Sequence, residues 1–405
     1  MSPASAEAVD VAGRSDGGGR NAGRPERDPV LDLVRAGALV VVVAWHWGFT
    51  TLRWDEGPRV GNPIGETPGL WLATWVLQVM PLFFLIGGAL HSAALDRLIT
   101  QHRAATSGAA TGTSGSVART FVSARYRRLV RPVVPLLALA ATAAVAAAAL
   151  GRPDVVRGIV LMITPLWFLA VYLVLVLVAP LARRLHDRYG LWTVACGVAL
   201  VAVVDRALVL PSRGDVGLVA TLAVYALTWS VVHQLGFHLG ALRHAPRRAG
   251  WATCLGGFAA LGAAATWGGY PASMVGTHPD PISNMSPPNL AVVLLAVAQM
   301  GLLVVADRPL RAWCSGRRRL LATAGAWSMT VYVWHMLALA AFWGLLVVAV
   351  GAPDHTVDGS WWVQRPLWLI GPTVVAVPLF ALTGPGAGTR RHALRAAWRR
   401  WSATG

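Results

Sequence analysis

The stretch LDLVRAGALVVVVAWHWGFT, residues 31–50, has the length and apolar character of a membrane-spanning helix, which needs about 20 mostly apolar residues. It also holds Asp32 and Arg35 near its start and His46 deep within it. Charged and titratable side chains are costly in hydrocarbon, so those found there are candidates for function. On a helix, Arg35 and His46 are separated by about three turns plus 20°, or about 16 Å along the axis. Both therefore lie on one face, and Asp32 lies one turn before Arg35 and can pair with it.

The residues of this segment allow two interpretations. In the first, Arg35 reaches back to the lipid headgroups and His46 is a packed histidine with satisfied hydrogen bonds. In the second, the helix holds a long ligand whose anionic end meets Arg35 and whose reactive end meets His46. Evidence from the rest of the chain is needed to choose between them.

Composition places the whole chain in a membrane. Of its 405 residues, 55% are hydrophobic and 13% are charged, whereas a soluble domain is about 25% charged. We therefore expect an all-α polytopic membrane protein with the lipid bilayer as a partner. The net charge of +17 does not indicate nucleic acid, because the arginines cluster between apolar segments. The three cysteines lack metal-ligand spacing, so no metal site is expected.

Ten segments are apolar and long enough to cross a membrane. They cover, to within a few residues, 30–52, 69–92, 129–150, 158–181, 190–210, 216–241, 250–270, 289–306, 320–350 and 362–385. With the N-terminus in the cytoplasm, 27 of the 35 basic residues fall in cytoplasmic segments and 6 fall outside. The positive-inside rule then predicts that both termini are cytoplasmic.

Three regions follow from this organisation. Residues 1–29 are polar and rich in Gly, Ser and Arg, so we expect a disordered cytoplasmic tail. Residues 30–385 form the membrane domain. Residues 386–405 form a basic cytoplasmic tail, which either anchors the topology or lies as a short amphipathic helix on anionic lipid.

Arginines gather at the entry to the third apolar segment, in RYRRLVRPVVPLL (125–137). Arg125, Arg128 and Arg131 recur at i, i+3 and i+6, and the guanidinium group suits phosphate recognition. Topological anchoring accounts for some, but not all, of four arginines in seven residues. These three arginines are therefore candidate ligands for the phosphates of a donor.

The segment WSMTVYVWHMLAL (327–339) carries a second histidine within an apolar span. Ser328 lies seven residues before His335 and Tyr332 lies three before it, so all three share one helix face. Two deep histidines on separate spans, with arginines near the cytoplasmic surface, favour an active cavity over two unrelated packing histidines.

Taken in order, these pieces resemble the acyltransferase-3 family of integral membrane acyltransferases, over most of residues 30–385. The family opens with an LDxLR…H pattern with ten residues between Arg and His, matched here by LDLVRAGALVVVVAWH. The pieces MPLFFLIGG, YRRLVRP, LWFL and WSMTVYVWH follow in the family's order. Where the family often has Ser-Gly-Phe, this chain has Gly87, Gly88 and Ala89. No role for that serine is carried over, and the two glycines allow close approach of another helix.

The resemblance implies an O-acyltransferase of a bacterial-type inner membrane. Its acyl group, commonly acetyl, comes from acetyl-CoA as a co-substrate, with no bound cofactor. The acceptor is a hydroxyl on a sugar or another glycan, glycolipid or secondary metabolite. CoA is rich in phosphates, so Arg35, supported by Asp32, and the row of Arg125, Arg128 and Arg131 are expected to hold it.

The histidines take the chemical roles in this interpretation. His46 acts as the general base that removes the proton of the acceptor hydroxyl, or it carries the acyl group itself. His335, with Ser328 and Tyr332, orients the acceptor or stabilises the tetrahedral oxyanion. The alternative function is a transporter or flippase for a small or lipid-linked substrate, since ten spans around a polar cavity suit that function too.

Overall fold

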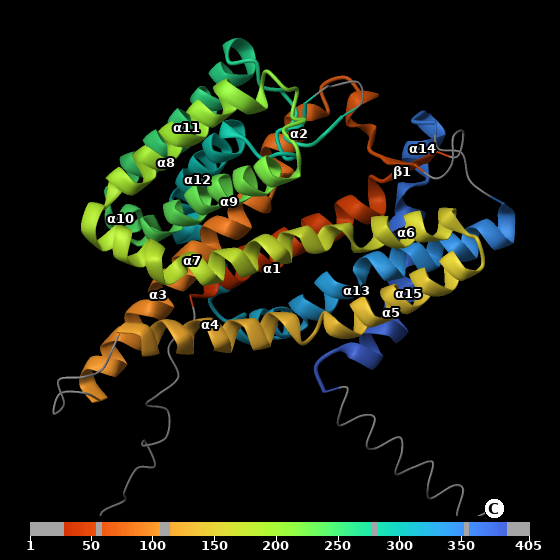
Figure 1. The fold of residues 1–405 in the computed structure, drawn as a ribbon, viewed down its shortest axis with the longest axis horizontal. Coiled ribbons are helices and arrows are strands. Elements are labelled where there is room, and N and C mark those ends of the chain that lie inside the picture. The colour runs from red at the N-terminus through yellow and green to blue at the C-terminus, as the bar shows by residue number, and fades with distance from the viewer. Residues whose placement is uncertain (1–27, 54–58, 106–113, 278–281, 352–355, 387–405) are drawn as a thin grey trace, which may run out of the picture.

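The computed structural model describes residues 28–53, 59–105, 114–277, 282–351 and 356–386, and both predicted tails lie almost wholly outside these ranges. The described chain is a bundle of long helices (Figure 1). Its helices are α1 (Pro29–Gly48), α2 (Trp71–Leu77), α3 (Met80–Ala105), α4 (Ser114–Val130), α5 (Val134–Ala149), α6 (Pro153–Ile163), α7 (Trp167–Tyr189), α8 (Leu191–Val204), α9 (Leu218–Phe237), α10 (Leu239–His244), α11 (Arg247–Trp267), α12 (Leu290–Cys314), α13 (Arg318–Val350), α14 (Gly359–Val363) and α15 (Arg365–Thr383). A hairpin of two short antiparallel strands, β1 (Thr51–Arg53) and β2 (Arg59–Gly61), follows α1.

The prediction of an all-α membrane protein with about ten spans is confirmed. In the described parts of the chain, nine helical segments are long and apolar enough to cross a membrane. The pair α4 and α5 makes a tenth if its two halves count as one span, with a bend of 49° between them. Pro132 lies in this break and cannot donate a backbone hydrogen bond, so the helix that enters it ends at Val130.

Helix α1 lies in the middle of the bundle and contacts α3, α12, α13 and α15 (Figure 1). Near its start, Val30 and Leu31 belong to the core formed with α3, α9 and α12. Further along, Leu39, Val43 and Trp47 pack with α13 and α15 in a second core. The two cores hold α1 on different sides and so fix the position of the helix in the bundle.

Glycines let α3 and α9 cross with their backbones in contact. A Cβ atom on Gly88 would collide with the carbonyl oxygen of His233, and one on Gly236 would collide with that of Leu85. Close approach at small residues is a common way to pack helices in membranes, where no hydrophobic force drives them together. The prediction that the glycine pair of α3 admits another helix is therefore confirmed, and α9 is that helix.

Neighbouring glycines of α11 allow a matched test of such packing. A Cβ atom on Gly257 would lie 2.5 Å from the backbone nitrogen of Ala298 in α12, whereas one on Gly256 would meet nothing within 4 Å. We expect Gly257→Ala to lower the free energy of unfolding by about 1–3 kcal/mol, because the helices must separate. Gly256→Ala should leave it unchanged or raise it by up to about 1 kcal/mol, because alanine favours the helix. Denaturant unfolding in one detergent measures both, and equal losses would contradict the assigned contact.

Candidate active site

His46 of α1 and His335 of α13 form a hydrogen-bonded pair. The Nδ1 atom of His46 lies 2.9 Å from the Nε2 atom of His335, and the two rings are nearly parallel. The Nδ1 atom of His335 lies 2.8 Å from the carbonyl oxygen of Tyr332. A carbonyl oxygen only accepts, so Nδ1 of His335 carries a proton and Nε2 of the neutral ring carries none. His46 must then donate through Nδ1, which leaves its own Nε2 atom unprotonated and able to act as a base.

The two histidines differ in their access to ligand. His46 lines a cavity of about 2220 Å³, whereas His335 is 1% exposed and lies behind it. The hydrogen bond from behind places His335 where a buried carboxylate often lies beside a catalytic histidine. The sequence predicted that the two histidines belong to one active cavity, but it predicted neither their hydrogen bond nor the position of His335 behind the cavity.

The end of α1 that carries His46 is fixed from α13 and α15. The indole Nε1 of Trp47 donates to the carbonyl oxygen of His335 at 3.0 Å. Arg365 donates to the carbonyl oxygen of Gly48 at 3.3 Å and lies 3.8 Å over the ring of Trp361. A cation at a helix C-terminus is favourable because the free carbonyls carry partial negative charge. The contact of Arg365 with the end of α1 was not predicted from the sequence.

The cavity follows the length of α1. Near the start of the helix its walls include Asp28, Arg97 and Arg318, and at the opposite end they include Gln78 and Ser286. Within the part of the chain that the structure describes, seven arginines line it, and they come from α1, α3, α4, α7, α10 and α13: Arg35, Arg97, Arg125, Arg128, Arg183, Arg243 and Arg318. The cavity is thus strongly basic along one part of its length and carries an imidazole further along.

Four predicted residues of the donor site line this cavity, and a fifth does not. Asp32, Arg35, Arg125 and Arg128 are part of its walls, and the carboxylate of Asp32 lies 3.9 Å from the Arg35 guanidinium. Arg131 is exposed and lies beyond the end of α4. The predicted row of three arginines needs an unbroken helix, which Pro132 prevents because the residue before a proline is disfavoured in the α conformation.

Ser328 and Tyr332 also line the cavity, but their hydroxyl protons already form hydrogen bonds with backbone carbonyls. Tyr332 donates its hydroxyl proton to the carbonyl oxygen of Pro165 at 3.0 Å, and Ser328 donates to that of Gly325 at 2.9 Å. A hydroxyl has one proton and two lone pairs. In this arrangement both side chains can accept hydrogen bonds from a ligand, and neither offers a donor to an oxyanion.

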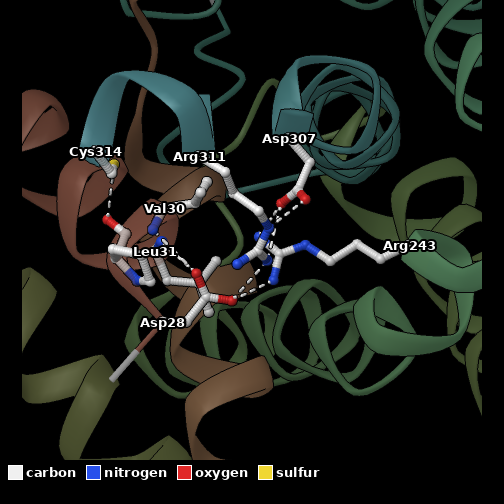
Figure 2. A network of polar contacts seen from close by, with 8 residues as sticks. Asp28, Val30, Leu31, Arg243, Asp307, Arg311 and Cys314 are labelled. Atoms are coloured by element: carbon white, nitrogen blue, oxygen red, sulfur yellow. Dashed lines mark hydrogen bonds and ion pairs between the residues drawn. The ribbon is translucent and has the colours of Figure 1, made fainter. Parts of the chain in front are cut away.

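A cluster of four charges fixes the start of α1 (Figure 2). The Asp28 carboxylate caps the helix and pairs with Arg243 at 2.6 Å and with Arg311 at 3.3 Å. Asp307 pairs with both arginines, at 2.9 and 2.6 Å. Burial raises the pKa of Asp28, but the two guanidinium groups outweigh it and hold that pKa below its usual value. Two negative and two positive charges thus fasten α1 to α10 and α12, and Arg35 follows two turns later.

Comparison with known proteins gives one match. The acyltransferase-3 family model, described as an acyltransferase domain, matches residues 28–384. No curated protein and no solved structure matches the chain. The matched range begins at the residue that caps α1 and ends just after α15, so it includes every helix that lines the cavity.

Proposed function

Because the chain belongs to the acyltransferase-3 family, we propose that it is a membrane O-acyltransferase that moves an acetyl group from acetyl-CoA to a hydroxyl group of a sugar or related acceptor. It is an acyltransferase of groups other than aminoacyl groups and a multi-pass membrane protein. The acceptor is a glycan, a glycolipid or a secondary metabolite, and the membrane is the inner membrane of a bacterium. The transporter interpretation receives no support from the family match.

The observation that carries the proposal is the hydrogen bond between His335 and His46, which lines the cavity; with Nδ1 of His46 as the donor, its Nε2 atom is free to act as a base. The acceptor hydroxyl gives its proton to this nitrogen while its oxygen attacks the thioester carbonyl carbon. The tetrahedral intermediate then collapses, the C–S bond breaks, and the CoA thiolate takes the proton from His46. His335 accepts the Nδ1 hydrogen bond throughout and stabilises the imidazolium form. Direct acylation of the same nitrogen is the second route.

The donor is proposed to lie along α1 with its phosphates at Arg35, Arg125 and Arg128. These three arginines share the cavity with His46, and guanidinium groups bind phosphates through paired hydrogen bonds. The distance of about 16 Å along the helix between Arg35 and His46 suits the extended arm that separates the phosphates of CoA from its thioester. The oxygens of Ser328 and Tyr332, which can still accept, would then orient the acceptor.

The two ends of the cavity support separate entries for the two substrates. We assign the arginine-rich end to the cytoplasm, in line with the positive-inside distribution, and acetyl-CoA would enter there. At the other end, Gly276 and Ser286 belong to the loop between α11 and α12. The acceptor would reach His46 from that end.

The test is acetyl-CoA turnover by purified protein in lipid nanodiscs, followed as release of free thiol. Wild-type protein should release thiol, and envelope extract should stimulate the release. Arg35→Ala should raise the KM for acetyl-CoA about tenfold or more, because hydrogen bonds to a charged group are lost. Arg131→Ala is the matched control, since this arginine is exposed and outside the cavity. If wild-type protein neither binds nor consumes acetyl-CoA, even with extract present, the proposed donor is wrong.

A further inference from the structure

A second pair of histidines lies in the bundle, and the proposed mechanism does not use it. The Nδ1 atom of His91 in α3 lies 3.0 Å from the Nε2 atom of His233 in α9. The hydroxyl of Tyr172 in α7 lies 3.2 Å from the Nε2 atom of His91. The two histidines are 2% and 1% exposed, and His91 and Tyr172 line the cavity. Three side chains from three helices thus form one hydrogen-bonded chain that ends at the cavity.

The glycines of α3 build this chain. The contact of Gly88 with α9 brings the two helices close enough for His91 to reach His233. A Cβ atom on Gly87 would lie 2.8 Å from the ring of Tyr172. Any side chain at position 87 would therefore displace the phenol, so Gly87, which stands where the family often has serine, makes room for this arrangement.

The surroundings of the phenol are positively charged. Arg35, Arg125 and Arg128 line the same cavity and act electrostatically on Tyr172. The ring of Phe121 lies between Arg125 and His91. The Arg125 guanidinium lies 3.7 Å over its face, and the His91 ring contacts it at right angles. A neutral hydrogen-bond donor surrounded by guanidinium groups is suited to an anion with several acceptor oxygens.

Counting protons shows how the chain serves such an anion. A phenol has one proton, so Tyr172 can donate to a ligand only if its oxygen accepts from Nε2 of His91. Nδ1 of His91 is then bare and accepts from Nε2 of His233. All three hydrogen bonds run in one direction, toward the cavity. We propose that Tyr172, positioned by His91 and His233, is the neutral donor of a phosphate-binding site that it forms with Arg35, Arg125 and Arg128.

The phosphate has two possible sources with the same chemistry. One is the pyrophosphate of the acyl-CoA donor, and this assignment rests on the proposed function. The other is the phosphate of a lipid-linked acceptor, for which a polyprenyl phosphate is the probe. Pantetheine, which has the arm of CoA without its phosphates, is the probe for effects that do not involve phosphate.

The experiment measures binding of CoA, pantetheine and a polyprenyl phosphate to protein in nanodiscs. Tyr172→Phe keeps the ring over Gly87 and removes only the hydroxyl. It should weaken CoA or polyprenyl phosphate binding about tenfold or more and leave pantetheine unchanged, because one hydrogen bond to a charged group is lost. His91→Leu should weaken binding of the same ligand. The double variant should bind it no more weakly than either single variant, because the two residues act through one hydrogen-bonded chain. Tyr189→Phe is the control, since this tyrosine of α7 is half exposed and outside the cavity.

Each outcome of the binding experiment supports or overturns the phosphate site or the proposed donor. Weakened CoA binding identifies the donor as the source of the phosphate. If wild-type protein does not bind CoA but binds polyprenyl phosphate, and Tyr172→Phe weakens that binding, the phosphate site stands and the proposed donor is overturned. Wild-type turnover of acetyl-CoA, with both phosphates bound equally by wild type and Tyr172→Phe, overturns the site and leaves the proposed function standing. If Tyr172→Phe weakens pantetheine binding as much as CoA binding, the phosphate site is also overturned, because Tyr172 would then act through packing.

Discussion

Replacing His46 by alanine should lower the rate of acyl transfer about 10²–10⁴-fold, the range that a general base contributes. The variant loses the imidazole of His46, the member of the His46–His335 pair that lines the cavity. The arginines of the donor site are untouched, so CoA binding should change little. Thiol release and CoA binding, measured on the same nanodisc sample, separate the two effects.

His46→Asn is the matched control for this change. Its side-chain amide can still donate to Nε2 of His335, which keeps the hydrogen bond between α1 and α13. It has no basic nitrogen, so it should be as inactive as His46→Ala while unfolding at a higher denaturant concentration. A His46→Asn protein that transfers acyl groups at the wild-type rate would refute the assigned base and the acyl-carrier route together.

The second large effect is expected at His335. His335→Leu removes the acceptor that holds the proton of His46 on Nδ1, and losses of about 10–100-fold are usual when such an orienting partner is removed. His335→Gln supplies a carbonyl oxygen that can accept the same hydrogen bond, so it should retain most of the rate. The loss should fall on kcat and leave the KM for acetyl-CoA unchanged. Equal rates for the leucine and glutamine variants would contradict the orienting role.

The fold was predictable because lipid sets a simple rule. Each span must be apolar on nearly all sides, so its length and position can be read directly from the sequence. The segment that begins at Leu31 predicted a membrane span, and the structure has helix α1 there. The glycine pair at residues 87 and 88 predicted a close helix contact, which the structure also has. The shared face of Arg35 and His46 follows from helical periodicity alone, and both residues line the cavity.

Contacts between distant spans could not be predicted in the same way. In a soluble bundle, the apolar face of each helix indicates the side that packs, whereas a membrane helix is apolar toward both lipid and protein. The partners of His46, His91 and Asp28 therefore left no local signal. Arg131 shows the opposite error, since a local periodicity was extended across the break that Pro132 makes.

The long sequence separation of the contacts of α1 has a consequence for how the enzyme is made. Asp28 lies 283 residues before Arg311, and His46 lies 289 residues before His335. A ribosome delivers α1 to the membrane before α12 and α13, so this helix waits through the synthesis of the intervening spans without its complete ionic anchor and without the acceptor for its imidazole. A nascent or truncated chain that stops before α13 would hold the arginines of the cavity but would lack the His335 contact that orients the proposed base. Like the His335→Leu variant, such a chain is expected to consume the proposed acyl donor more slowly than the finished enzyme.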